Sequence, residues 1–196
     1  NLNHNQITEM NWEGCPNTLT YMSLDRNQIK EMNWEGCPGN LTKIDLNSNR
    51  IQELNWEGCP ENLVEIQLTL NRIQELRVIN WEYIPQKLTK INLCDNNFQE
   101  MNWKNCPKNL TEIDLCRNNI KEMNWEGCPE NLTNIHLRFN EIKELNWKGC
   151  PKTLTGIDLG SNCIEEMNWD YCPWNLTWIY LGNNRIKELK WKGCPE

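Results

Sequence analysis

Eleven cysteines and two histidines are the side chains of this 196-residue chain best able to bind a metal or to act as nucleophiles. A catalytic nucleophile and its base would appear once, in one pocket, whereas most of these cysteines recur at a fixed interval. Zinc requires four ligands in near-tetrahedral geometry, and the sequence contains no Cys-x-x-Cys pair. These residues therefore favour neither an enzyme nor a site for a metal or another cofactor.

Cys94 and Cys116 stand outside the main cysteine pattern. Each directly follows a short apolar segment, and the two occupy the same position in consecutive copies of the pattern. They could remain free thiols or form a disulfide across neighbouring strands. A third alternative, part of a metal site with His136, lacks the further ligands that zinc would need. We expect both thiols on an exposed face.

Eight other cysteines share one position of the pattern, and Ile84 takes this position in the copy that lacks the cysteine. An isoleucine marks the position as apolar, so we expect buried free thiols. Adjacent copies would place the Cα atoms about 4.8 Å apart, within disulfide range, but side chains that point the same way suit a disulfide poorly. These cysteines are Cys15, Cys37, Cys59, Cys106, Cys128, Cys150, Cys172 and Cys194.

One glutamate also recurs in every copy. Like charges at such spacing repel, so the column must be solvated or paired with cations. Lysines such as Lys121 and Lys143 directly precede it, which favours a solvated, salt-bridged edge. A repeating calcium site of glutamate and asparagine oxygens is the alternative. The column comprises Glu9, Glu31, Glu53, Glu75, Glu100, Glu122, Glu144, Glu166 and Glu188.

The interval behind these columns is 22 residues. It is clearest in two ladders, and both contain one interval of 25 where three residues are inserted near Arg77-Val78-Ile79. We therefore expect residues 1–196 to form one array of about nine repeats, with the long repeat near residues 71–95 and neither end capped. The ladders are Trp12, Trp34, Trp56, Trp81, Trp103, Trp125, Trp147, Trp169 and Trp191, and Asn5, Asn27, Asn49, Asn71, Asn96, Asn118, Asn140, Asn162 and Asn184.

The aligned copies read Leu-Thr-x-Ile-x-Leu-x-x-Asn-x-Ile-x-Glu-Met/Leu-Asn-Trp-x-Gly-Cys-Pro-x-Asn, and residues 110–131 are the best instance. The segment Leu-x-x-Ile-x-Leu-x-x-Asn-x-Ile resembles the signature of leucine-rich repeats. The short period and the Pro-x-Asn-Leu approach are most similar to the bacterial-type subclass, which includes internalin-like adhesins. The resemblance covers the whole chain and implies a right-handed solenoid with a parallel β-sheet on its concave face.

The residues alone lead to the same architecture. Ile113 and Leu115 alternate with Glu112 and Asp114, which is typical of a short, half-buried strand. Such strands must stack on their neighbours, and head-to-tail repeats make the pairing parallel. Gly-Cys-Pro leaves little room for an α-helix, so we expect turns, extended segments or a 3₁₀ turn on the convex side. The equivalent strands are expected at 21–24, 43–46, 65–68, 90–93, 134–137, 156–159 and 178–181.

Both ladders have a structural interpretation. An asparagine amide supplies the two donors and one acceptor that a sharp turn between stacked coils requires. A tryptophan in every copy predicts a core that fills the convex half of each coil, with the indole N–H bonded to a backbone carbonyl. The alternative is an exposed platform that stacks sugars or nucleic-acid bases. Identity in every copy favours the core.

Function is expected where the copies differ, on the positions that flank the strand apolars. These positions are chemically mixed and lie on the concave face, which predicts recognition of a protein or other macromolecular partner. Residue types common at binding hot spots gather in the later copies. The expected contact residues are Tyr21, Arg26, Lys43, Asp45, Glu65, Lys90, Glu112, Asp114, Arg117, His136, Arg138, Phe139, Asp158, Trp178 and Tyr180.

Four copies carry an Asn-Leu-Thr glycosylation acceptor in one register. In a secreted eukaryotic protein these would be surface sites. Duplication of one repeat explains all four acceptors, so together they are a single piece of evidence for glycosylation. Used acceptors would place the protein outside cells or in a virion, whereas free thiols would place it in the cytoplasm. The acceptors are Asn40, Asn109, Asn131 and Asn175.

Composition narrows the function further. The chain has no alanine, which disfavours a helical bundle. Its formal net charge of −7 and the lack of a basic block disfavour nucleic-acid binding, and no apolar run is long enough to span a membrane. Two hypotheses result: a non-enzymatic scaffold that binds a partner through its concave face, and a structural solenoid whose copies stack end to end in a filament, coat or surface layer.

Overall fold

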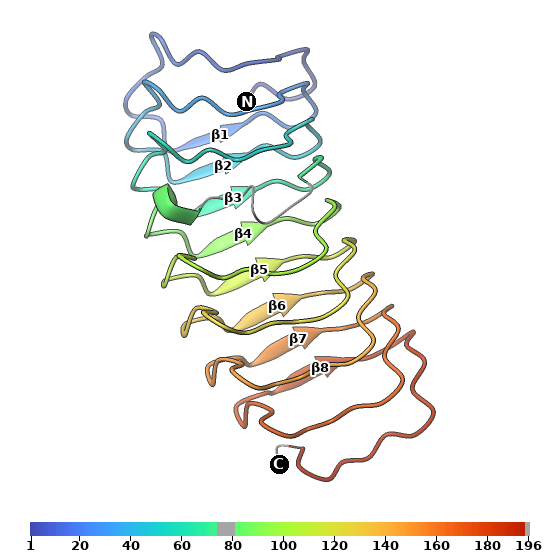
Figure 1. Ribbon diagram of the computed structural model, residues 1–196. Coiled ribbons are helices and arrows are strands. Elements are labelled where there is room, and N and C mark those ends of the chain that lie inside the picture. The colour runs from blue at the N-terminus through green and yellow to red at the C-terminus, as the bar shows by residue number, and fades with distance from the viewer. Residues whose placement is uncertain (74–80, 195–196) are drawn as a thin grey trace.

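A computed structural model describes residues 1–73 and 81–194 of the chain. The described coils stack into a solenoid whose eight short strands form one parallel sheet in chain order (Figure 1). This confirms the fold expected from the repeats. The strands are β1 Tyr21–Ser23, β2 Lys43–Asp45, β3 Glu65–Gln67, β4 Lys90–Asn92, β5 Glu112–Asp114, β6 Asn134–His136, β7 Gly156–Asp158 and β8 Trp178–Tyr180.

The strands pair in the register that the repeat dictates. Ile44 pairs with Ile66, and Ile66 pairs with Ile91 across the longer interval. In each of these strands the central isoleucine points into the core, and its two neighbours point out of the sheet. The strands begin where the sequence predicts and end one residue earlier, although the N–H of the following leucine still bonds to the next coil, as Leu46 N does to the carbonyl of Gln67 at 2.9 Å.

The return segments are turns and extended chain. Among the described residues there is no α-helix, and one 3₁₀ turn, η1 Trp81–Tyr83, lies in the long repeat (Figure 1). The insertion predicted near Arg77-Val78-Ile79 lies outside the described residues. In the described part of the chain, no helix has the length and hydrophobicity needed to cross a membrane.

Each coil contributes the same set of side chains to one continuous core. In the coil of β5, Leu110, Ile113, Leu115, Ile120 and Trp125 are at most 2% exposed. Because neighbouring coils present identical sets at the same height, apolar side chains meet across every interface between coils. No coil has a complete core of its own, so the fold is stabilised by stacking.

The asparagine ladder closes the turn that follows each strand. The Nδ2 of Asn118 donates to the carbonyl oxygens of Leu115 in its own coil and of Leu93 in the preceding coil, at 3.0 and 3.1 Å. Its Oδ1 accepts the backbone N–H of Phe98 at 3.0 Å. The amide thus satisfies turn groups of two coils at once, as the sequence predicts.

The tryptophan ladder lies in the core opposite the sheet. Trp125 is 2% exposed, and its indole N–H donates to the backbone carbonyl of Asn146 in the next coil at 2.8 Å. The rings of Trp147 and Trp169 stack with their centroids 6.5 Å apart, whereas neighbouring strands lie about 4.8 Å apart. Coils are therefore more widely spaced on the tryptophan side, which places the sheet on the concave side.

Candidate functional site

The concave face of the sheet carries every residue predicted to contact a partner. Eleven lie on the strands, and Arg26, Arg117, Arg138 and Phe139 lie in the turns that follow them. All fifteen are exposed or half-buried, so the register brings them together on one open surface. Their side chains divide this surface into a charged half over β1–β5 and an aromatic half over β6–β8.

The charged half is largely neutralised by its own ion pairs. Lys43 contacts Glu65 at 2.6 Å and Lys90 contacts Glu112 at 2.9 Å, each across one step of the sheet. Burial raises the pKa of Glu65, but hydrogen bonds from Lys43 and Gln67 outweigh it and hold this pKa below its usual range. The hydrogen bond to Glu112 raises the pKa of Lys90. This half presents paired charges.

Cys94 and Cys116 lie next to each other between the two halves. The backbone N–H of Asp95 donates to the carbonyl of Cys116 at 2.9 Å, so the two cysteines stay in register beyond the strands. Both are half-buried free thiols. A hydrogen bond with Cys94, burial and the Asp114 carboxylate raise the pKa of Cys116, while the same contact lowers the pKa of Cys94.

The eight cysteines of the repeated column are less buried than expected: Cys59 and Cys106 are buried, and the other six are half-buried. All eleven cysteines lie in the described part of the chain and are free. Burial raises the pKa of Cys37 and of Cys172 to about 12, with neighbouring thiols of the column adding to the effect. Within residues 1–73 and 81–194, no three histidine, cysteine or carboxylate side chains gather in a way that could hold a metal ion.

The aromatic half contains a compact group of side chains, here called the aromatic–arginine cluster: Arg117, Arg138, Phe139, Trp178 and Tyr180. The guanidinium carbons of Arg117 and Arg138 lie 4.7 and 4.9 Å from the centroid of the Phe139 ring. Arg138 also lies 5.6 Å from the ring centroid of Tyr180. All three distances are within cation–π range. The cluster therefore joins three coils through stacked planar groups.

Two glycines make room for this cluster. A Cβ atom at Gly156 would overlap the Trp178 ring, and one at Gly160 would lie 2.6 Å from Cδ1 of Tyr180. Both rings therefore lie flat over β7 and reach toward β6, where Trp178 comes within 6.0 Å of the His136 ring. The sequence does not reveal this arrangement, because the glycines and the rings belong to different coils.

A column of left-handed backbone conformations runs along the edge of the same face. The residue before each ladder asparagine has a positive φ although none is glycine, as in Arg117 (φ 51°) and Phe139 (φ 57°). Its N–H is held by the next coil, as Phe139 N is by the carbonyl of Gly160 at 3.0 Å. A bulky side chain in this conformation is strained, and because the conformation recurs in every coil it belongs to the scaffold. The other members are His4, Arg26, Ser48, Leu70, Asp95, Ser161 and Asn183.

The four glycosylation acceptors are exposed, and their asparagines have a structural role. Asn131 Nδ2 donates to the backbone carbonyl of Lys108 in the preceding coil at 2.9 Å, and the other three make the equivalent bond. Asn62, which is followed by Leu-Val and is not an acceptor, also makes it. The bond therefore accounts for the asparagine at this position without glycosylation.

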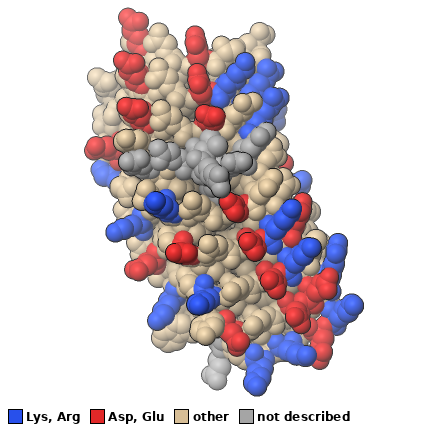
Figure 2. All heavy atoms as spheres, in the orientation of Figure 1, with Lys and Arg blue, Asp and Glu red and all other residues tan. Residues whose placement is uncertain are grey.

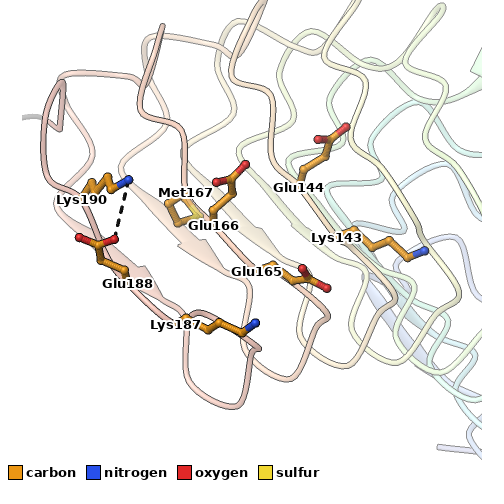
Figure 3. Close-up of a pocket in the computed structure, with 8 residues that line it drawn as sticks. All are labelled: Lys143, Glu144, Glu165, Glu166, Met167, Lys187, Glu188 and Lys190. Carbon is orange, nitrogen blue, oxygen red and sulfur yellow. Dashed lines mark ion pairs between the residues drawn. The ribbon is translucent and has the colours of Figure 1, made fainter.

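The glutamate column lies on the convex edge among lysine side chains. A hollow of about 570 Å³ opens between three successive coils and is lined by Lys143, Glu144, Glu166, Lys187 and Glu188 among others (Figure 3). Side chains of consecutive residues such as Lys143 and Glu144 point apart. The expected pairing with the preceding lysine is therefore absent here, and Glu188 instead lies 3.8 Å from Lys190. Acidic and basic side chains are interspersed over the face in Figure 2, so the edge is solvated and mixed in charge.

No protein-family model matches the sequence, and no curated protein is significantly similar to it. Solved structures do match. A chain of the Drosophila Toll–Spätzle complex superposes with a TM-score of 0.80 at 20% identity, covering 96% of this chain and 26% of that one. YopM from Yersinia enterocolitica WA-314 gives 0.63 at 22% identity, covering 94% and 41%. The leucine-rich-repeat domain of APL1 gives 0.70 at 18% identity, covering 100% and 58%.

The chain thus spans from about a quarter to somewhat over half the length of these three structures. At such low identity the similarity shows the fold alone. The 22-residue period agrees with the short repeats expected from the sequence. The fold of this chain is that of a leucine-rich-repeat solenoid.

Proposed function

We propose that this protein is a non-enzymatic scaffold that binds a protein partner through its concave face. The observation that carries the proposal is the contrast between the constant core and the varied, exposed surface of the sheet. Trp178 and Tyr180 are 41% and 45% exposed, whereas the leucine, isoleucine and tryptophan positions of the core recur from coil to coil. Exposed aromatic and arginine side chains in one patch are typical of binding hot spots.

One further observation supports this function. One of the similar structures is that of a chain within the Toll–Spätzle complex, an assembly of proteins. The net charge of −7 argues against nucleic acid as the partner.

Capture of partners from the cells that make the protein tests the proposal. The concave triple variant Trp178→Ala, Tyr180→Ala, Arg138→Gln should lose the captured protein. A matched convex variant, Tyr171→Ala, Trp174→Ala, Lys190→Gln, removes two exposed aromatics and one cation from the opposite side and should retain it. Unchanged capture by the concave variant, with the fold verified by circular dichroism, would refute the proposal.

A further inference from the structure

We propose that the aromatic–arginine cluster binds a carboxylate side chain in an acidic peptide segment of the partner, with an aromatic or apolar side chain beside it. This inference rests on the proposed function and specifies the chemistry of its site. Arg138 is the residue that would receive the carboxylate. Phe139, Trp178 and Tyr180 would form the apolar surroundings.

Within the part of the chain that the structure describes, the ion pairs of the concave face leave Arg138 as an unpaired cation. Four of the five lysines and arginines on the concave face lie within 4.0 Å of a carboxylate: Lys43, Lys90, Arg26 at 3.7 Å from Asp25, and Arg117 at 3.8 Å from Asp95. Arg138 has no such partner among the described residues. The face therefore neutralises all of these cations except the one in the centre of its aromatic half.

The geometry around Arg138 orients its guanidinium for a carboxylate. The guanidinium of Arg138 is held between the rings of Phe139 and Tyr180, and its Nε is buried without a hydrogen-bond partner. A guanidinium stacked on aromatic rings is already oriented and partly desolvated, so less conformational freedom is lost on binding. Its terminal nitrogens can donate two parallel hydrogen bonds, which is the geometry that a carboxylate accepts.

Exposed aromatic side chains lie around the Arg138 cation. Phe139 and Tyr180 are 41% and 45% exposed beside Arg138, so a residue next to the bound carboxylate would contact aromatic rings. Asp114 and Asp158 lie on the same face, on strands β5 and β7. They repel every anion, but a chain of phosphates brings many charges near them, whereas a carboxylate side chain brings one. This favours an acidic peptide over a nucleic acid.

A peptide selection tests the inference without knowledge of the natural partner. Random linear peptides displayed on phage are selected against the full chain, and enriched sequences are synthesised for titration. We expect aspartate or glutamate next to an aromatic or apolar residue. Arg138→Gln should weaken these peptides by about tenfold or more, as should replacement of their acid by the amide. Arg50→Gln, at an exposed arginine outside the expected contact residues, should bind them normally.

The outcomes separate this inference from the proposed function. Enriched peptides that lack acids, or acidic peptides that Arg138→Gln binds equally well, would overturn the carboxylate site while leaving a concave protein-binding face in place. Competition by an oligothymidine as strong as that by the acidic peptide would show a general anion site and overturn it too. Failure to enrich any peptide would also count against it, whereas loss of partner capture tests the proposed function separately.

Discussion

The guanidinium of Arg138 lies 5.6 Å from the ring centroid of Tyr180, two strands away across the concave face. Gly160, on the intervening coil, permits this contact because any side chain there would collide with the Tyr180 ring. A constant scaffold thus supports a local surface that occurs in a few coils of the array. Four predictions test the scaffold, and the last measurement tests the surface.

The asparagine ladder should contribute strongly to stability. Asn118→Ala removes the hydrogen bonds to the carbonyls of Leu93 and Leu115, which still accept from neighbouring ladder asparagines, and leaves the buried N–H of Phe98 without a partner. We expect a loss of about 3 kcal/mol in the free energy of unfolding, measured by urea denaturation. Asn119→Ala, at the exposed neighbouring position, should change it by no more than about 0.5 kcal/mol. Equal losses in both variants would contradict this role.

The tryptophan ladder should behave as core. Trp125→Ala removes a ring that is 2% exposed and its bond to Asn146, and should cost about 3–5 kcal/mol. Trp174 is 74% exposed, so Trp174→Ala serves as the control and should be nearly neutral. If the Trp174 variant were the less stable one, the assignment of the ladder to the core would be wrong.

Tyr171 occupies a left-handed position (φ 67°) at which other copies carry glycine, such as Gly127 (φ 78°). Its ring is 77% exposed, so little packing offsets the strain. Tyr171→Gly should raise the midpoint of thermal unfolding, equivalent to about 0.5–1 kcal/mol, because relief of strain exceeds the added freedom of the unfolded chain. The reverse change, Gly127→Ala, should lower it; a rise would contradict the argument.

Because of the cysteine column, the stability of the protein should fall at alkaline pH. Burial raises the pKa of Cys37 to about 12 from its ordinary value of 9.0, so the folded thiol binds its proton more tightly than the unfolded one. The contribution of the Cys37 thiol to the free energy of unfolding is therefore constant below pH 9.0 and is lost as the pH rises toward 12. The midpoint of urea denaturation should fall as the pH is raised from neutral to about 10.5, and it should fall less in Cys37→Ile.

Cys37→Ile is a conservative test because Ile84 occupies the equivalent position in the long repeat and is 3% exposed. A pH dependence identical in the variant and the parent would show that this thiol is not responsible.

Periodic features could be predicted from the sequence, and local ones could not. Strand positions, the donors and acceptor of Asn118 and the carbonyl bonded to Trp125 follow from a residue type repeated at 22-residue intervals, because stacking copies forces equal environments on equal positions. The threonine ladder, in which Thr133 Oγ1 donates to the carbonyl of Thr111 at 3.0 Å, is equally periodic but was not predicted. Threonine at a strand start has several bonding partners within reach, so its type alone did not identify one.

The candidate site was predicted as a set of residues and not as an arrangement. Alternation along the strands placed Arg138, Phe139 and Tyr180 on one face. Their stacking depends on Gly156 and Gly160, which leave space on a neighbouring strand, and that relationship has no period in the sequence. The left-handed conformation of Phe139 was not predicted either, because its side chain favours other conformations and bonds to the next coil override that preference.

Site-specific photo-crosslinking tests the central claim, that a protein partner binds the concave face, most directly. A benzophenone amino acid replaces Tyr180 on the concave face or Tyr171 on the convex side, two exposed tyrosines of neighbouring coils, and the cells that make the protein are irradiated. The account predicts a discrete crosslinked protein from position 180 and none from position 171. Crosslinks from position 171 alone would contradict it.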